Sequence, residues 1–150
     1  MLPIYKTKKR KTTTTTKKTD LVKKLDKVFS LYIRVRDTMP NGFCRCISCG
    51  QIKPFKSIDA GHYYSRTHMA TRFHPDNVHG ECTYCNRYRS DHLIQYRKNL
   101  IIKIGAGRVD RLEALSSSTK HWLDCELEQM IAFYKEETKK MCAVKGIKLR

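Results

Sequence analysis

The fold is decided by two short cysteine motifs, Cys46-Ile47-Ser48-Cys49-Gly50 and Cys82-Thr83-Tyr84-Cys85, separated by residues 51–81. Two cysteines in C-x-x-C spacing within a tight turn direct both sulfurs at one tetrahedral ion, and two such turns complete a four-cysteine zinc site. Gly50 permits the positive φ that turns backbone N–H groups toward a thiolate. The sequence therefore predicts structural Zn²⁺ on Cys46, Cys49, Cys82 and Cys85, with unrelated buried or redox thiols as the alternative.

The other cysteines are harder to place. The chain has seven, and an odd number without a signal peptide argues against a disulfide framework. Cys44 could replace Cys46 as a ligand, although only Cys46 gives the C-x-x-C-G pattern. Cys125 and Cys142 are far from both motifs and are typical of ordinary helix residues.

The net charge of +17 predicts a polyanionic partner, and nucleic acid is the commonest one. Much of it lies at the ends: residues 1–19 carry seven lysines and arginines, residues 139–150 carry five, and neither segment has an acid. We expect a disordered basic arm over 1–19, one domain over 20–138 and a basic tail over 139–150. With no long apolar run and no signal-like start, we expect no membrane partner and a cytoplasmic location.

Hydrophobic periodicity predicts an α+β fold. A helix is expected over 20–37, capped by Thr19 or Asp20, and short strands and loops over 43–82. Further helices are expected from about Thr83 for two turns, from a Ser90 cap to Gly105, around Val109–Leu115, and from a Ser117 or Ser118 cap onward.

Between and after the cysteine motifs stand His62, then Asn77 five residues before Cys82, then Asn86 directly after Cys85. Each residue alone is a weak signal, but their order is informative. It resembles the HNH or ββα-metal nucleases whose third position is Asn rather than His. It also resembles endonuclease VII, a phage Holliday-junction enzyme with Asn right after its last zinc cysteine.

A closer resemblance, over about residues 20–138, is to the phage lambda NinG (Rap) family. The strings that carry it are Cys44–Gly50, Asp59–Tyr63, Asn77–Cys82, Cys85–Tyr88 and Leu93–Lys98. The resemblance implies a zinc-stapled ββα core at about 43–92, wrapped by N- and C-terminal helices. It also implies a phage- or prophage-encoded nuclease that acts on branched recombination DNA, such as Holliday junctions, D-loops and flaps.

Phosphodiester hydrolysis needs a nucleophilic water, a sink for the developing charge and help for the leaving oxygen. The resemblance therefore implies that His62 takes the proton from water and that Asn86 is one ligand of a catalytic Mg²⁺ or Mn²⁺. Asn77 would hydrogen-bond across the hairpin and fix the loop that carries His62, without touching the metal ion itself.

One departure from the HNH pattern concerns the residue before the catalytic His, which is commonly Asp, Glu or His and here is Gly61. Asp59 is the first choice for the second metal ligand, because a strand places residues 59 and 61 on one face and Gly61 leaves room. His79, which shares strand parity with Asn77, is the runner-up. The remaining histidines, His68, His74, His92 and His121, are expected to be structural or superficial.

Basic side chains near this site are candidates for holding DNA phosphates, with a solvated basic surface as the alternative. They are Arg66, Arg72, Arg87, Arg89, Arg97 and Lys98. Neighbouring tyrosines, Tyr63, Tyr64, Tyr84 and Tyr88, could stack on unpaired bases.

Two other functions stay open at this point: a non-catalytic zinc-finger protein that binds nucleic acid, and an HNH nuclease that cuts ordinary duplex. Two-fold symmetric junctions favour a homodimer, although no dimer surface is identifiable in the sequence.

Overall fold

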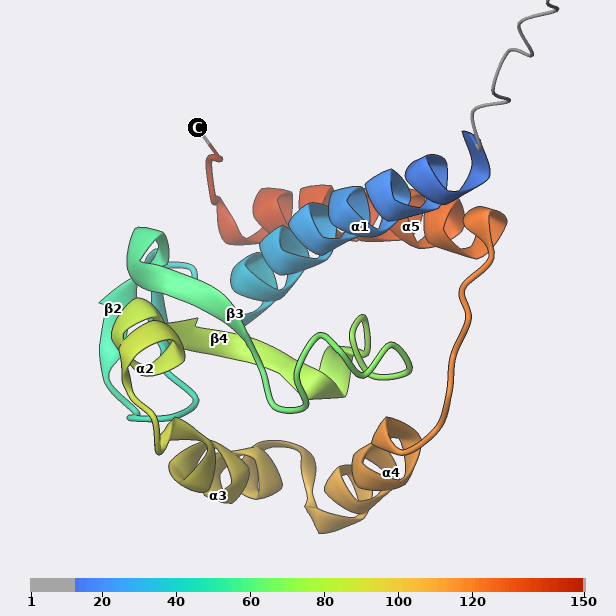
Figure 1. The fold of residues 1–150 in the computed structure, drawn as a ribbon. Helices are drawn as coiled ribbons and strands as arrows, with labels where there is room; N and C mark the ends of the chain where they lie inside the picture. Colours follow the sequence, from blue (N-terminus) through green and yellow to red (C-terminus); the bar gives the residue numbers. More distant parts are fainter. Residues whose placement is uncertain (1–12, 150) are drawn as a thin grey trace, which may run out of the picture.

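The computed structural model describes residues 13–149 and has the expected mixture of helices with small antiparallel sheets (Figure 1). Its elements in chain order are α1 (Thr13–Asp37), β1 (Phe43–Arg45), β2 (Ile52–Pro54), β3 (Ile58–His62), β4 (Val78–Cys82), α2 (Thr83–Tyr88), α3 (His92–Ile104), α4 (Ala106–Ser116) and α5 (Asp124–Lys145). Single turns of 3₁₀ helix at Phe55–Ser57 and Pro75–Asn77 precede β3 and β4. The α+β class is therefore confirmed.

Two hairpins form the sheets. Strand β1 pairs with β2, and β3 pairs with β4. In the second hairpin Asp59 lies opposite Glu81 and Gly61 lies opposite His79. Helix α2 begins directly after β4, so the chain runs strand, strand, helix through the region that carries the candidate site.

Helices α1 and α5 lie side by side and cover one face of the β3–β4 hairpin (Figure 1). Every third or fourth residue of α1 is apolar, which gives the buried stripe Leu25, Phe29 and Ile33. This stripe packs with Ala60 and Val78 of the hairpin and with Leu127, Ile131 and Tyr134 of α5. Each large side chain buried there contributes about 1.5–3 kcal/mol, so the two terminal helices fix the hairpin strongly.

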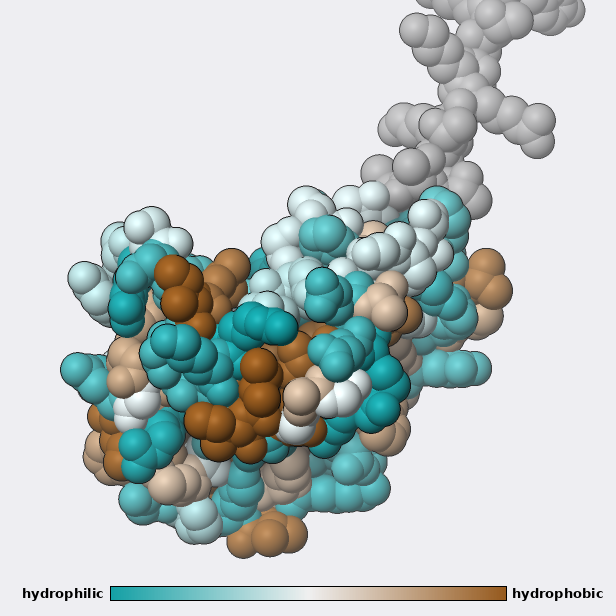
Figure 2. All heavy atoms as spheres, turned by 90° about the horizontal axis from the view of Figure 1, so that it is seen from below, coloured by the Kyte–Doolittle hydropathy of each residue, from teal (hydrophilic) through white to brown (hydrophobic). Residues whose placement is uncertain are grey.

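Helices α3 and α4 lie at the lower edge of the molecule (Figure 1). Their buried residues Tyr96, Leu100, Val109 and Leu112 pack around Ile47, which belongs to the first cysteine turn. Seen from below, hydrophobic residues gather near the middle of the face among hydrophilic ones (Figure 2). Exposed apolar residues of α3 include Ile94, at 65% exposure, and Ile102, at 82%.

The two ends of the domain differ from the sequence-based boundaries. Helix α1 begins at Thr13 rather than near Asp20, so residues 13–19 are helical, while the rest of the expected arm, residues 1–12, lies outside the described residues. Helix α5 continues to Lys145, into the expected tail. Its Lys145 ammonium donates to the carbonyls of Val35, Arg36 and Thr38, which pins this segment against the end of α1.

The predicted serine caps were wrong. Ser118 donates its hydroxyl to the Leu115 carbonyl at 2.7 Å, so it closes α4 instead of opening α5. Helix α5 starts six residues later, where the Glu126 carboxylate accepts the Leu123 backbone N–H at 2.8 Å. The residue that precedes α3 is Asp91 rather than Ser90. Within residues 13–149, no helix is both long and apolar enough to cross a membrane.

Candidate functional site

The four predicted cysteines come together between the two hairpins and the start of α2. The sulfurs of Cys46, Cys49, Cys82 and Cys85 all lie within 4.8 Å of one another, and the Cys49 and Cys82 sulfurs are 3.9 Å apart. Tetrahedral zinc with Zn–S bonds of about 2.3 Å needs sulfurs roughly 3.8 Å apart. The cluster could therefore hold a zinc ion.

Backbone groups around the cluster fit thiolate ligands. The N–H groups of Cys49 and Cys82 point at the Cys46 sulfur, at 3.5 and 3.2 Å. Gly50 has a φ of +73°, as the motif predicted. The group of four sulfurs that could hold a metal ion includes Cys46, whereas Cys44 is buried outside it, so the geometry favours Cys46 over Cys44.

Next to the cluster lies an open cleft of about 1310 Å³. Its walls come from α1, β3, the loop after β3, α2 and the start of α3. Three of the predicted catalytic and metal-binding residues line it: Asp59, His62 and Asn86. Residues as far apart in the sequence as Ser30 and Arg97 thus line the same concave surface.

Asp59 and Asn86 are in direct contact. The Asn86 amide donates to Asp59 Oδ2 at 3.1 Å, and the Arg87 guanidinium binds both oxygens of the same carboxylate at 2.8 and 3.0 Å. Burial opposes ionisation of Asp59, but the hydrogen bonds from Arg87 and Asn86 outweigh it and lower the pKa of the carboxyl group. Two oxygen-bearing side chains, one of them anionic, therefore meet at the cleft wall.

His62 stands at the end of β3 and faces the same cleft. Its Nε2 lies 3.0 Å from the carbonyl oxygen of Arg72, so Nε2 carries the proton and donates it. Burial lowers the pKa of this imidazole, which keeps the ring neutral at neutral pH. A neutral ring that donates through Nε2 has its lone pair on Nδ1, and such a ring can accept a proton.

Asn77 does not line the cleft but holds the loop that surrounds it. Its side chain is fully buried, accepts the Tyr64 N–H at 2.8 Å, and donates to the carbonyls of Tyr64 and Thr71 at 2.9 and 3.1 Å. The loop it closes contains the Arg72 carbonyl that orients His62. This is the position expected of a residue that fixes the His62 loop.

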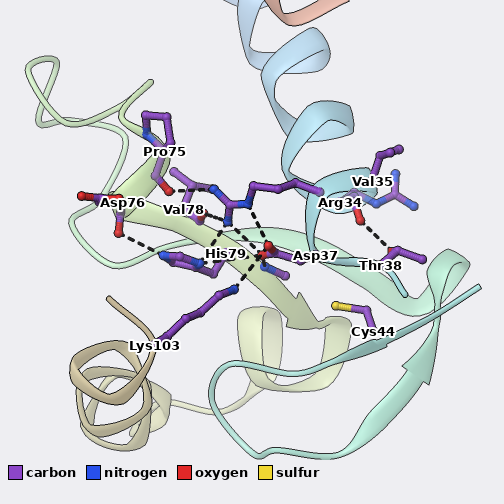
Figure 3. Close-up of polar contacts among 12 residues, drawn as sticks. Arg34, Val35, Asp37, Thr38, Cys44, Pro75, Asp76, Val78, His79 and Lys103 are labelled. Carbon is purple, nitrogen blue, oxygen red and sulfur yellow. Dashed lines mark hydrogen bonds and ion pairs between the residues drawn. The ribbon is translucent and has the colours of Figure 1, made fainter. Parts of the chain in front are cut away.

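His79, the runner-up metal ligand, lies in a separate buried polar group (Figure 3). Its Nε2 lies 3.1 Å from the Asp76 carbonyl oxygen, and its Nδ1 lies 3.7 Å from Asp37 Oδ2. Lys103 reaches the other oxygen of Asp37 at 3.3 Å. His79 therefore helps to tie β4 to α1 and α3 and is absent from the cleft wall, where Asp59 stands beside Asn86.

The room expected beside Gly61 is filled. A Cβ added at Gly61 would lie 2.8 Å from the Cβ of Glu81, whose carboxylate is packed against this glycine. The glycine is thus required by a cross-strand neighbour, which corrects the expectation that it leaves space for a metal ion.

The six predicted basic residues divide into two groups. Arg66, Arg87 and Arg97 line the cleft. The others do not: Arg72 is bound to Asp26 of α1 at 2.6 and 3.0 Å, Arg89 is bound to Asp91 at 2.7 Å, and Lys98 is exposed on α3.

The cleft also contains residues that the sequence did not indicate, namely Ser30, Arg34, His68 and His92. Arg34 comes from α1, donates to the Phe55 carbonyl at 3.0 Å and stacks on the Phe55 ring. With Ser30 it forms an i, i+4 polar pair beside the apolar stripe of α1, which was the one sequence signal available.

Comparison with known proteins gives a consistent result. Residues 4–143 match the family described as "Bacteriophage Lambda NinG protein". The chain is 36% identical to Protein ninG of Escherichia phage lambda over 123 residues, which is 79% of this chain and 55% of that protein. Protein ninG of Salmonella phage P22 and of Escherichia phage 933W match equally, each over 56% of its length. The chain thus spans about half the length of the curated relatives it matches, and no solved structure matches it.

Proposed function

This chain belongs to the bacteriophage lambda NinG family, and we propose that it is a metal-dependent endonuclease that hydrolyses phosphodiester bonds in branched DNA. The observation that carries the proposal is the shared cleft, in which a neutral imidazole faces an Asp–Asn pair among arginines. The chain order of β3, β4 and α2, next to a cysteine cluster that could hold zinc, supports the proposal of a zinc-stapled ββα core of the HNH type.

His62 is the proposed general base. Its Nε2–H is anchored on the Arg72 carbonyl, so the ring cannot rotate freely and its Nδ1 lone pair is available to a water molecule. The proton taken from that water would reside on Nδ1 and make the imidazole cationic. Arg72 supports this state only through its carbonyl dipole, since its guanidinium is paired with Asp26.

Asp59 and Asn86 fit a divalent ion such as Mg²⁺ or Mn²⁺, because both present oxygen donors and Asp59 supplies a negative charge. When bound, such an ion would polarise the scissile phosphate and stabilise the leaving 3′-oxygen. The amide of Asn86 would turn its oxygen, rather than its NH₂ group, toward the ion. Arg87 now pairs with the same carboxylate, and its exposed side chain is free to shift to a phosphate oxygen.

Four arginines, Arg34, Arg66, Arg87 and Arg97, line the cleft against one acidic residue, Asp59. This excess of positive charge favours a polyanionic substrate, and planar guanidinium groups suit phosphate oxygens. The four side chains come from α1, the loop after β3, α2 and α3, so they could contact phosphates on different sides of the cut bond.

The proposed preference for branches is supported by exposed apolar residues in the cleft and by exposed tyrosines on α2. Leu93 and Ile94 line it and are 40% and 65% exposed. On α2, Tyr84 and Tyr88 are 66% and 75% exposed, with ring centroids 6.5 Å apart. Aromatic rings can stack on bases that have lost their partners, as in a single-stranded flap, and apolar side chains can pack against base pairs exposed at an opened branch point.

One experiment tests these proposals together. The full chain would be incubated with a four-way junction, a flap and a linear duplex, each with Mg²⁺, with Mn²⁺ or with chelator. The matched variants are His62→Ala and His68→Ala, since His68 also lines the cleft but is not assigned a role in the reaction. We expect metal-dependent cutting of the branched substrates that His62→Ala reduces at least 100-fold and His68→Ala leaves within about 3-fold.

The other outcomes separate the alternatives. If no substrate is cut under any condition, while the chain still binds DNA, the protein is a non-catalytic zinc-finger binder. Equal cutting of duplex and branched DNA would identify a general HNH nuclease. Cutting that survives His62→Ala would show that another group is the base.

A further inference from the structure

Glu81 is a carboxylate enclosed by the protein next to the proposed metal site. It lies on β4 opposite Asp59, is fully buried, and packs against the backbone of Gly61. Its Oε1 accepts a short hydrogen bond from the Ser48 hydroxyl, which belongs to the first cysteine turn. The carboxylate is therefore fixed in position by β3, β4 and the cysteine turn together.

The same Oε1 holds His92, the first residue of α3. The Nδ1 of His92 lies 2.6 Å from it, and because a carboxylate accepts, Nδ1 carries the proton. The His92 side chain is 18% exposed and lines the cleft with Asp59 and Asn86. Within the described part of the chain, the His92 Nε2 makes no hydrogen bond, so this nitrogen is open to a ligand in the cleft.

A carboxylate that accepts from one imidazole nitrogen while the other nitrogen is free is the usual second layer of a metal site, where it fixes the tautomer and orientation of the ligating histidine. We propose that His92 is a third ligand of the divalent ion assigned to Asp59 and Asn86, and that Glu81 is its positioning residue. The proposal rests on the proposed function, because it extends the metal site of that function.

The arrangement also answers what replaces the side chain missing at Gly61. The acidic group is supplied by the neighbouring strand, through Glu81, and acts on the ion through His92. One imidazole nitrogen among oxygen ligands favours a transition-metal ion over Mg²⁺, which prefers oxygen throughout. Tighter binding of Mn²⁺ than of Mg²⁺ is therefore expected if His92 is a ligand.

The test measures metal binding rather than cleavage. The full chain, with zinc in the cysteine cluster, would be titrated with Mn²⁺, and bound ions would be examined by pulsed electron paramagnetic resonance for coupling to imidazole ¹⁴N. We expect one Mn²⁺ with nitrogen coupling in the unmodified protein. His92→Gln can still donate to Glu81, so it should fold with full zinc content but lose the coupling and bind Mn²⁺ at least 10-fold more weakly.

Two controls complete the test. His68→Ala and His62→Ala, which remove other imidazoles from the cleft, should keep the nitrogen coupling. Ser48→Ala should leave the coupling but weaken Mn²⁺ binding, because Glu81 loses one of its two hydrogen-bond donors. Coupling that persists in His92→Gln, or Mn²⁺ bound without any nitrogen coupling, would overturn the assignment.

The result is separable from the nuclease proposal. Nitrogen-coupled Mn²⁺ in a protein that cuts no DNA would retain the His92 ligand and reject the enzyme. Cutting by a protein whose Mn²⁺ is bound only through oxygen would retain the enzyme and reject His92. A chain that binds no Mn²⁺ at all would contradict both.

Discussion

Replacing Asn77 with alanine should destabilise the protein by about 3 kcal/mol. The side chain is fully buried and makes three hydrogen bonds to the backbone of Tyr64 and Thr71, at 2.8 to 3.1 Å. Each such bond contributes about 0.5–1.5 kcal/mol net, and its loss leaves a backbone group buried without a partner. The loss is a large share of the 5–15 kcal/mol typical of a domain.

Urea unfolding followed by tryptophan fluorescence measures this loss. Trp122 is the one tryptophan, and its indole donates to the Met69 carbonyl inside the loop that Asn77 closes. With an m-value of about 2 kcal/mol/M, the midpoint should fall by about 1.5 M. Zinc must be kept at one concentration throughout, because a bound metal adds to apparent stability.

The matched control is Asn41→Ala, since Asn41 is exposed and accepts one bond, from the Phe43 N–H. It should cost less than about 1 kcal/mol. Asn77→Asp, which keeps the shape but faces two carbonyls with a carboxylate, should cost at least as much as Asn77→Ala. A loss under 1 kcal/mol in both Asn77 variants would refute the view that this side chain holds the His62 loop.

Three further predictions follow from other parts of the molecule. Cys82→Ser should lose about one zinc per chain and unfold more readily, whereas Cys125→Ser, at an exposed position outside the cluster, should keep its zinc by metal analysis. Burial, aided by the charges of Lys103 and Arg36, lowers the pKa of His79 to about 3, so the unfolded chain alone takes up this proton between pH 6.5 and 3. The free energy of unfolding should therefore decrease as the pH is lowered below about 6.5. His79→Gln should reduce this decrease by up to about 1.4 kcal/mol per pH unit, measured by urea unfolding between pH 7 and pH 5. Equal pH dependence of the two proteins would reject the assignment. Residues 1–12 carry five lysines and arginines. Removing them should reduce the slope of log affinity for DNA against log salt concentration by up to about 4, and should leave the cutting rate at saturating DNA unchanged.

The parts of the fold that sequence predicted well are those with local causes. The cysteine spacing gave the four-sulfur cluster, and the apolar repeats of α1 and α5 gave their packed faces. Gly105 ended α3 as expected, with a φ of +86°. Helix starts were predicted less well, because a serine hydroxyl can donate backward to a carbonyl, as Ser118 does, instead of accepting from the turn ahead.

The cleft was predicted in part, for a related reason. The hairpin and the helix that directly follows it contain Asp59, His62 and Asn86. Because these elements are consecutive in the chain, the sequence pattern was enough to predict that the three side chains lie near one another. Arg34 reaches the cleft from α1, across a contact that no local pattern encodes. Arg72 was misplaced because an acidic partner, Asp26, lies 46 positions away in the sequence.

Gly61 shows most clearly why reading along the chain was insufficient. The expectation for the second metal ligand weighed Asp59 on β3 and His79 on β4, and it took Gly61 to leave empty space. Pairing of β3 with β4 instead brings Glu81 over that glycine, so the register of the hairpin fills this space with a carboxyl side chain from the other strand. A side chain at residue 61 and the present position of Glu81 are mutually exclusive, because they would occupy the same volume. Gly61, Glu81 and His92 therefore form one structural unit, and a substitution at any of them should be judged by its effect on the other two.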